Sequence, residues 1–191
     1  ATAADAGVSI VNERVGDINS GNIKGSRTTT QAETGVLASG VDYSLQRRLT
    51  IPRPRHHLVG AQCDLAVDVD PDYVELHFIV DDFFAWIIPT GDARCRVGVA
   101  TTSNPTPALD RFIRRLKQGS RIHSTKKTNP VYGVIPRHDP SLKTHIDGIC
   151  LVGDAAGHVK ATTGGGIIMG CTAARHLAAP DYDAAWRADI G

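Results

Sequence analysis

The chain has 191 residues, and its 21 lysines and arginines against 20 aspartates and glutamates give a formal net charge of +1. This balance excludes a protein that binds nucleic acid through bulk charge. The hydrophobic content of 41% is typical of a globular protein, and no apolar run approaches the ~20 residues of a membrane-spanning helix. Residues 1–7 lack the basic and apolar parts of a secretory signal, so we expect a cytoplasmic protein.

The first third of the chain reads as short strands and turns. Residues 7–15 alternate between apolar and polar side chains, which predicts a half-buried strand. Residues 17–26 are rich in Gly and Asn and predict a hairpin turn, and residues 27–32 predict a second strand. The run TGVLA at 34–38 predicts a short buried strand, which leads into Ser39 and Gly40.

The middle of the chain, from His56 to about Tyr132, is richer in long β-like runs, which suggests an antiparallel or mixed sheet. The runs are residues 59–68, 73–79, 85–88 and 95–100. One helix is predicted at 107–119, where a proline opens it and a glycine ends it. Its apolar face has the helical spacing i, i+3, i+4, i+7 and consists of Leu109, Phe112, Ile113 and Leu116.

The same helix begins a strongly basic segment. Seven positive charges and no acid occur between residues 111 and 127, and the predicted helix carries Arg111, Arg114, Arg115 and Lys117. Such a surface would attract an anionic membrane or a phosphate-bearing substrate. The alternative, which we favour on the sequence alone, is an ordinary solvated helix face, because net charge carries no directional information.

Cysteine and histidine spacing gives no sign of a metal centre or a disulfide framework. No cysteine belongs to a Cys-x-x-Cys pair, and only His56 and His57 are adjacent among the eight histidines. We therefore expect no metal site and predict buried free thiols at Cys63, Cys95, Cys150 and Cys171.

The segment after residue 148 is the most informative. A buried strand at 148–152 ends in Gly153 and Asp154, and three glycines at 164–166 open a helix predicted at 166–178. Glycines and a helix N-terminus allow a ligand to approach the backbone closely. Asp154, at the carboxyl end of a strand, could accept hydrogen bonds from sugar-alcohol hydroxyls. The alternative is an N-cap aspartate followed by packing glycines.

These residues carry a resemblance to a known family. Residues 151–170 resemble the second flavin-binding motif of FAD-dependent oxidoreductases of the p-hydroxybenzoate hydroxylase-like superfamily, and VGDAAGHVKATTGGGI is most similar to the geranylgeranyl reductase family. FFAWIIP at 83–89, followed by CRVGV at 95–99, resembles that family's aromatic-Ala-Trp-x-x-Pro strand. VLASGVDYS at 36–44 is similar to its Ala-Asp-Gly-x-x-Ser motif.

The resemblance implies a set of cofactor contacts. Asp154 would hold the ribityl chain of FAD, and three glycines would lie against the pyrophosphate and isoalloxazine. The full set is Ser39, Gly40, Gly153, Asp154, Ala155, Gly157, Gly164, Gly165 and Gly166. Ser39 stands where the family has aspartate, which removes a carboxylate expected near the cofactor.

The resemblance also implies a substrate side. Phe84 and Trp86 would face a cavity for an isoprenoid or another apolar small molecule, with a core pair as the alternative. His158 is the candidate proton donor, because histidine titrates near neutrality. The alternative is that His158 is a surface residue at the entry to the following helix.

The expected fold is α/β with α+β character. A partial FAD-binding domain, residues 1–48 and 142–191, would be interleaved with a mixed or antiparallel substrate-binding sheet domain, residues 49–141. In the family, the Gly-x-Gly-x-x-Gly loop for the ADP half of FAD lies in an N-terminal βαβ unit, which this chain does not show. We therefore expect weak or absent FAD binding by this chain alone, and open strand edges that favour a homo-oligomer.

Three functions remain open at this stage. The first is an FAD-dependent reductase that transfers hydride from reduced flavin to an isoprenoid C=C bond, in a protein that is cytoplasmic or peripheral to a membrane. The second is a flavin-dependent aromatic hydroxylase. The third is an inactive or accessory binding and assembly module derived from such a flavoprotein.

Overall fold

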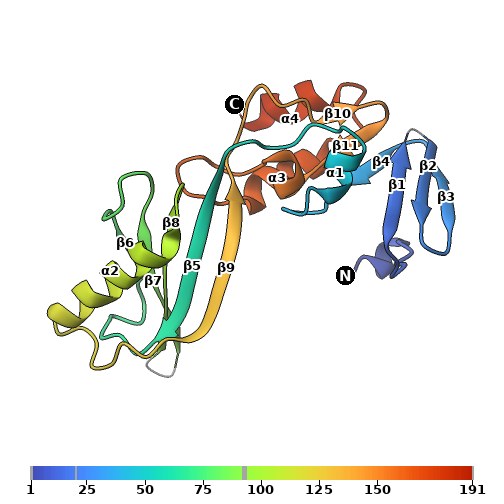
Figure 1. The fold of residues 1–191 in the computed structure, drawn as a ribbon. Coiled ribbons are helices and arrows are strands. Elements are labelled where there is room, and N and C mark those ends of the chain that lie inside the picture. Colours follow the sequence, from blue (N-terminus) through green and yellow to red (C-terminus); the bar gives the residue numbers. More distant parts are fainter. Residues whose placement is uncertain (1, 20, 92–93, 191) are drawn as a thin grey trace. The chain divides into compact units, whose positions relative to one another are not determined.

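A computed structural model describes residues 2–19, 21–91 and 94–190. Residues 1, 20, 92–93 and 191 lie outside this description, and with them Ser20 of the predicted hairpin turn. Figure 1 shows the chain coloured along its sequence. The chain divides into two units. The first unit consists of Ala1–Arg53, Pro140–His158 and Gly166–Gly191, and the second unit of Pro54–Asp139 and Val159–Gly165.

The second unit is built on a five-stranded antiparallel sheet with the spatial order β6-β7-β8-β5-β9. Its strands are β5 (His57–Leu65), β6 (Glu75–His77), β7 (Ala85–Gly91), β8 (Arg94–Thr101) and β9 (Thr128–Pro136). The four strands predicted from the sequence are confirmed, with shifted ends.

Strand β9 was not predicted, because Pro130 and Pro136 interrupt its pattern. It lies at the edge of the sheet and pairs only with β5 among the described strands, as Figure 1 shows. An edge strand tolerates proline because its outward N–H groups have no partner strand.

Helix α2 (Pro105–Gln118) confirms the predicted amphipathic helix and starts two residues earlier. Asn104 caps it by accepting a hydrogen bond from the Thr106 N–H at 3.0 Å, and Pro105 occupies a position where no N–H is needed. The predicted apolar face is buried: Leu109, Phe112, Ile113 and Leu116 are each at most 4% exposed. They pack on the inner face of β5, β7 and β8 and form the core of this unit.

The first unit contains two small sheets. An antiparallel meander has the order β1-β2-β3, and a second sheet has the order β10-β11-β4, in which β11 and β4 are parallel. The strands are β1 (Val15–Asn19), β2 (Gly21–Gly25), β3 (Thr29–Ala32), β4 (Gly35–Leu37), β10 (His145–Ile146) and β11 (Ile149–Leu151). The combination of helices with parallel and antiparallel strands confirms the predicted α/β class with α+β character.

The strands predicted at 34–38 and 148–152 are confirmed as β4 and β11. Strand β11 is buried throughout, as predicted, whereas Val36 in the middle of β4 is 41% exposed. The strand predicted at 7–15 is wrong, because residues 8–14 form no strand and Val8, Ile10 and Val11 are more than half exposed. Alternation alone does not make a strand where no neighbouring strand supplies hydrogen bonds. The hairpin predicted at 17–26 is confirmed, because β1 and β2 pair antiparallel within this segment, although the two strands occupy more of it than predicted.

The helices of the first unit are short. They are the 3-10 turns η1 (Ala4–Ala6) and η2 (Gly153–Ala156) and the helices α1 (Ser44–Arg48), α3 (Ile167–Arg175) and α4 (Tyr182–Ile190). Helix α3 was predicted, whereas α1 and α4 were not. Tyr182 and Trp186 of α4 are buried against Met169 and Ala173 of α3. Within the three described ranges, no helix has the length and apolar character needed to cross a membrane.

The cysteine prediction holds for three residues and fails for one. Cys63, Cys95 and Cys150 are buried free thiols. Cys171 is also free but exposed, because it lies on the face of α3 that points away from the buried Met169.

Candidate functional site

Two loops meet at one edge of the β10-β11-β4 sheet. Strands β4 and β11 are parallel neighbours, and the Val152 N–H extends their pairing by donating to the Leu37 carbonyl at 3.1 Å. The segments that follow β4 and β11 therefore leave the sheet at the same edge, where ligands of open α/β sheets bind. The structure thus brings the loop with Ser39 and Gly40 beside the η2 turn with Asp154.

Two side chains from the first loop and from α1 hold the backbone of η2. The Tyr43 hydroxyl donates to the Asp154 carbonyl at 3.1 Å. The Gln46 amide donates to the Ala155 carbonyl at 3.0 Å and to the Pro52 carbonyl at 2.8 Å. Gln46 is completely buried. Sequence reasoning missed both residues, because no local pattern pairs them with a turn more than a hundred positions away.

The Asp154 carboxylate is left available by this arrangement. Asp154 lies inside η2, whose N-cap is Val152 with no side-chain cap, so the N-cap alternative is wrong. In the part of the chain that the structure describes, no group donates a hydrogen bond to its side chain, and partial burial raises the pKa of the carboxyl. A partly desolvated carboxylate without protein donors is suited to ligand hydroxyls.

His158 lies in the interior of the first unit. Its side chain is fully buried, and its Nδ1 accepts a hydrogen bond from the Gly153 N–H at 3.2 Å. Its ring packs at a tilt on Trp186, with centroids 4.5 Å apart. The surface alternative for His158 is therefore wrong, and the ring braces the start of η2 against α4.

The three glycines at 164–166 have different surroundings. Gly164 has a φ of +68°, and a Cβ there would lie 3.3 Å from Phe83 Cζ and 3.6 Å from Ile135 Cγ2, so only glycine fits comfortably. The Gly164 N–H donates to the Lys160 carbonyl, which closes a tight loop in the second unit. Gly165 is exposed, and Gly166 is the N-cap of α3 in the first unit.

Phe84 and Trp86 line the sheet face that α2 does not cover. Trp86 alternates with Ala85 and Ile87, which are fully buried under α2, so its side chain points to the opposite face. Phe84 contacts Trp86 edge to face at 6.3 Å between centroids and stacks on Phe83 at 4.1 Å. The same region exposes large apolar side chains, with Phe78 81%, Leu76 51% and Val131 49% exposed. It is a broad apolar surface with aromatic rings at its centre.

Comparison with known proteins decides the family. No family model matches the chain. The chain is 30% identical over 177 residues to digeranylgeranylglycerophospholipid reductase 2 of Methanothermobacter thermautotrophicus, covering 85% of this chain and 44% of that protein. It is 34% identical over 153 residues to digeranylgeranylglycerophospholipid reductase 2 of Methanopyrus kandleri, covering 72% and 38%. The chain belongs to the geranylgeranyl reductase family. It spans less than half the length of these curated relatives.

Solved structures share the fold of this geranylgeranyl reductase family member. A geranylgeranyl bacteriochlorophyll reductase-like protein from Thermoplasma acidophilum has a TM-score of 0.70 at 22% identity, covering 95% of this chain and 51% of that one. The flavin-dependent halogenase CmlS has a TM-score of 0.68 at 16% identity, covering 98% and 39%. The resemblance inferred from the motifs is confirmed at the level of family and fold.

Proposed function

We propose that this chain supplies the riboflavin-binding edge and the substrate-facing sheet of an FAD-dependent enzyme that reduces isoprenoid C=C bonds. The observation that carries the proposal is the Asp154 carboxylate, which is partly buried, receives no hydrogen bond from the described chain, and follows a parallel strand. Residues 1–48 and 142–191 would form the flavin-binding part, and residues 49–141 the substrate-binding part.

The residues at this edge fit the hydroxyl-bearing part of a flavin. Asp154 would accept hydrogen bonds from the ribityl hydroxyls, while Tyr43 and Gln46 hold the η2 backbone through the carbonyls of Asp154 and Ala155. Bound in its reduced form, FAD would supply the hydride. The remaining proposed cofactor contacts are Ser39, Gly40, Gly153, Ala155, Gly157, Gly164, Gly165 and Gly166. We assign His158 a positioning role, since its ring is buried against Trp186.

The apolar sheet face is suited to an isoprenoid substrate. Phe84 and Trp86 would contact the isoprenoid and exclude water. An uncharged alkene requires such a dry site for hydride attack. Because the relatives are named as phospholipid reductases, the substrate would be a membrane lipid. The exposed basic face of α2 would then contact the anionic membrane surface through Arg111, Arg114, Arg115 and Lys117.

Flavin binding by the full 191-residue chain tests the proposal. FAD and riboflavin would each be titrated and followed by flavin fluorescence anisotropy. Removing the carboxylate in Asp154→Asn should weaken both by about ten- to a hundredfold, since a charged hydrogen bond contributes roughly 1.5–3 kcal/mol. Asp147→Asn, at an exposed turn residue of the same unit, is the matched control. Measurable and equal flavin affinity of both variants and the unmodified chain would contradict the proposal.

A further inference from the structure

Strand β9 presents a long open edge of the five-stranded sheet. It is the last strand in the spatial order, and Figure 1 shows it beside β5, with which alone it pairs among the described strands. Residues 129–134 are all exposed. An unpaired edge of this kind is a template on which another strand can form hydrogen bonds.

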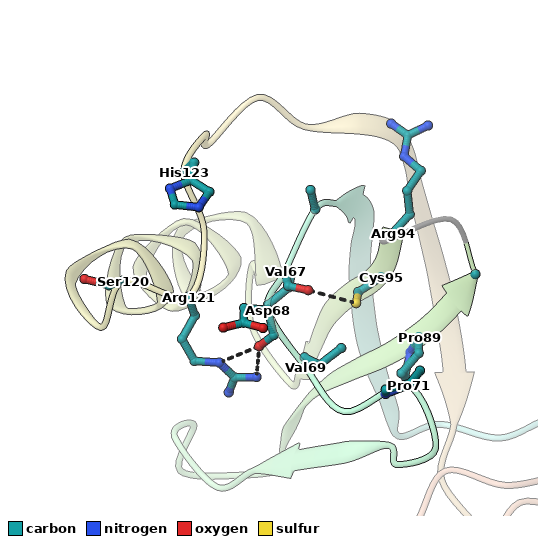
Figure 2. A pocket seen from close by; sticks show the side chains of 12 residues that line it. Val67, Asp68, Val69, Pro71, Pro89, Arg94, Cys95, Ser120, Arg121 and His123 are labelled. Atoms are coloured by element: carbon teal, nitrogen blue, oxygen red, sulfur yellow. Dashed lines mark hydrogen bonds between the residues drawn. The ribbon is translucent and has the colours of Figure 1, made fainter.

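Both ends of β9 are fixed to the sheet, so the edge has a defined geometry. At its start, the Thr128 hydroxyl accepts a hydrogen bond from Arg94 and donates to the Asp64 carbonyl, both at 3.0 Å. Arg94 also lines the pocket that Figure 2 shows at this end of the sheet. Just beyond the other end, the Arg137 N–H donates to the His56 carbonyl at 2.9 Å. A strand held in this way loses little conformational freedom when it pairs.

The register on β5 decides which backbone groups of β9 face outward. An antiparallel ladder forms its hydrogen bonds at every second residue, and Arg137 is one of the residues that bond toward β5. Residues 131, 133 and 135 therefore also direct their N–H and C=O groups to β5. It follows that Tyr132 and Val134 direct theirs away from the sheet, to the open edge.

This open edge is complementary to itself. With a two-fold axis through Gly133, Tyr132 lies opposite Val134 of a second copy, and each outward N–H of these residues meets an outward C=O. Pro130 and Pro136 face each other at the two ends of this pairing, where neither has an N–H to offer. A slip to either neighbouring register of the same phase would set a proline opposite Tyr132 or Val134 and leave a carbonyl without its donor. The prolines therefore select one register.

The side chains of the edge also suit a second copy of the same chain. The strand sequence TNPVYGVIP contains no charged residue, whereas edge strands commonly carry charges that keep copies apart. Tyr132 is 63% and Val134 40% exposed. An aromatic ring directly opposite a β-branched side chain stabilises an antiparallel pair, and the two-fold axis makes this contact twice.

We propose that β9 pairs with β9 of a second copy of this chain and joins the two five-stranded sheets into one. Residues that lie opposite each other share a face of the sheet, so the apolar faces that carry Trp86 in the two copies lie on the same side. Two strand edges bury less surface than the ~1,600 Å² of a standard interface, so the dimer is weak and dissociates on dilution. The proposal is independent of flavin and of the proposed function.

Sedimentation velocity of the full chain, without flavin and over a wide range of concentration, tests for this dimer. Val134→Lys places a charge on the open edge and should weaken dimerisation by at least about tenfold. Val134→Thr keeps a β-branched, uncharged side chain at the same position and is the matched control. A chain that stays monomeric at every concentration overturns the proposal. So does a dimer that Val134→Lys leaves unchanged, because it would form through another surface.

Disulfide trapping tests the register. Gly133→Cys would place two thiols on the two-fold axis, where the Cα atoms of a pair without hydrogen bonds lie about 4.5 Å apart, within the range of a disulfide. Nothing lies within 4 Å of a Cβ at this position. Val131→Cys, exposed on the same strand but away from the axis, is the control. Both variants also carry Cys171→Ser, because Cys171 is free and exposed.

Under mild oxidation, Gly133→Cys should give a covalent dimer much faster than Val131→Cys. Equal rates for the two variants, or faster trapping of Val131→Cys, would overturn the proposed register. The sedimentation of the Val134 variants does not depend on the cysteine variants, so the pairing is tested even if Gly133→Cys fails to fold.

Discussion

The indole of Trp86 lies directly over Gly98 of the neighbouring strand, where a Cβ would come within 2.3 Å of both its Cε2 and Cζ2 atoms. The glycine in the Val-Gly-Val run of β8 therefore leaves the space that the aromatic ring of Trp86 occupies. Because residue 98 has no side chain, the ring packs directly on the backbone of β8. The orientation of Trp86 depends on the absence of a side chain at residue 98.

Gly98→Ala should displace the Trp86 indole and destabilise the chain. Overpacking of this kind costs about 1–3 kcal/mol, which corresponds to a fall in melting temperature of ~2–4 °C per kcal/mol for a chain of this size. Gly133→Ala, on β9 of the same sheet, is the control, because nothing lies within 4 Å of a Cβ built there. Melting followed by circular dichroism makes the comparison. A Gly98→Ala chain that melts with the control would show that Trp86 moves aside at no cost.

Gln46→Met should destabilise the first unit and loosen η2. The substitution removes two hydrogen bonds and leaves the Pro52 and Ala155 carbonyls without their donor in a buried place, for an expected loss of about 2–4 kcal/mol. Gln118→Met, at an exposed position at the end of α2, should stay within about 0.5 kcal/mol of the unmodified chain. Urea denaturation of both variants measures the difference, and similar midpoints would show that the hydrogen bonds of Gln46 to Pro52 and Ala155 do not stabilise the first unit.

Asp154→Asn should stabilise the ligand-free chain at neutral pH. Burial raises the pKa of Asp154 above its ordinary value of 3.8, so the stability linked to this group is fully present below that value. It is lost as the pH rises through the raised native pKa. A neutral amide avoids this loss, so the gain should appear at pH 7 and be absent near pH 3.

Asp183→Asn is the control of opposite sign. Burial alone would raise the pKa of Asp183, but hydrogen bonds from Thr144 and from the His145 N–H lower it. Its stabilising contribution is present above its ordinary pKa and is lost as the pH falls through the lowered native value. Asp183→Asn should therefore lose stability at pH 7. Urea midpoints at both pH values test the pair, and an Asp154→Asn chain less stable than the original at pH 7 would contradict the assignment.

Neutralising the exposed face of α2 should reduce binding to anionic vesicles. Each cation near such a surface contributes about 1 kcal/mol, so replacing Arg111, Arg114, Arg115 and Lys117 with glutamine should weaken binding by more than about tenfold. Co-sedimentation with vesicles containing phosphatidylserine measures the effect, which should vanish in about 1 M salt. The control replaces four exposed cations of the first unit: Lys24, Arg47, Arg48 and Lys143. Equal losses in both variants would show that only net charge matters.

Local patterns in the sequence sufficed for the elements that bury a regular face. The spacing of Leu109, Phe112, Ile113 and Leu116 predicted the buried side of α2, because helical periodicity and burial share one period. The short apolar runs at β4 and β11 predicted strands for a different reason, because a continuous apolar run bounded by turn residues is typical of a strand inside a sheet. The flavin-like motif around Asp154 pointed to a family that comparison with other proteins then confirmed.

Contacts between distant parts of the chain were decided by the tertiary structure alone. Nothing near Gln46 shows that its amide will meet the Ala155 carbonyl, since 109 positions separate them. Nothing near His158 shows that its ring will be buried on Trp186. Pro130 and Pro136 obscured β9, whose pairing depends on its place at the sheet edge. Periodicity records which side of a segment avoids water, but the partner that covers this side, or accepts its hydrogen bonds, is set only when the chain folds back on itself.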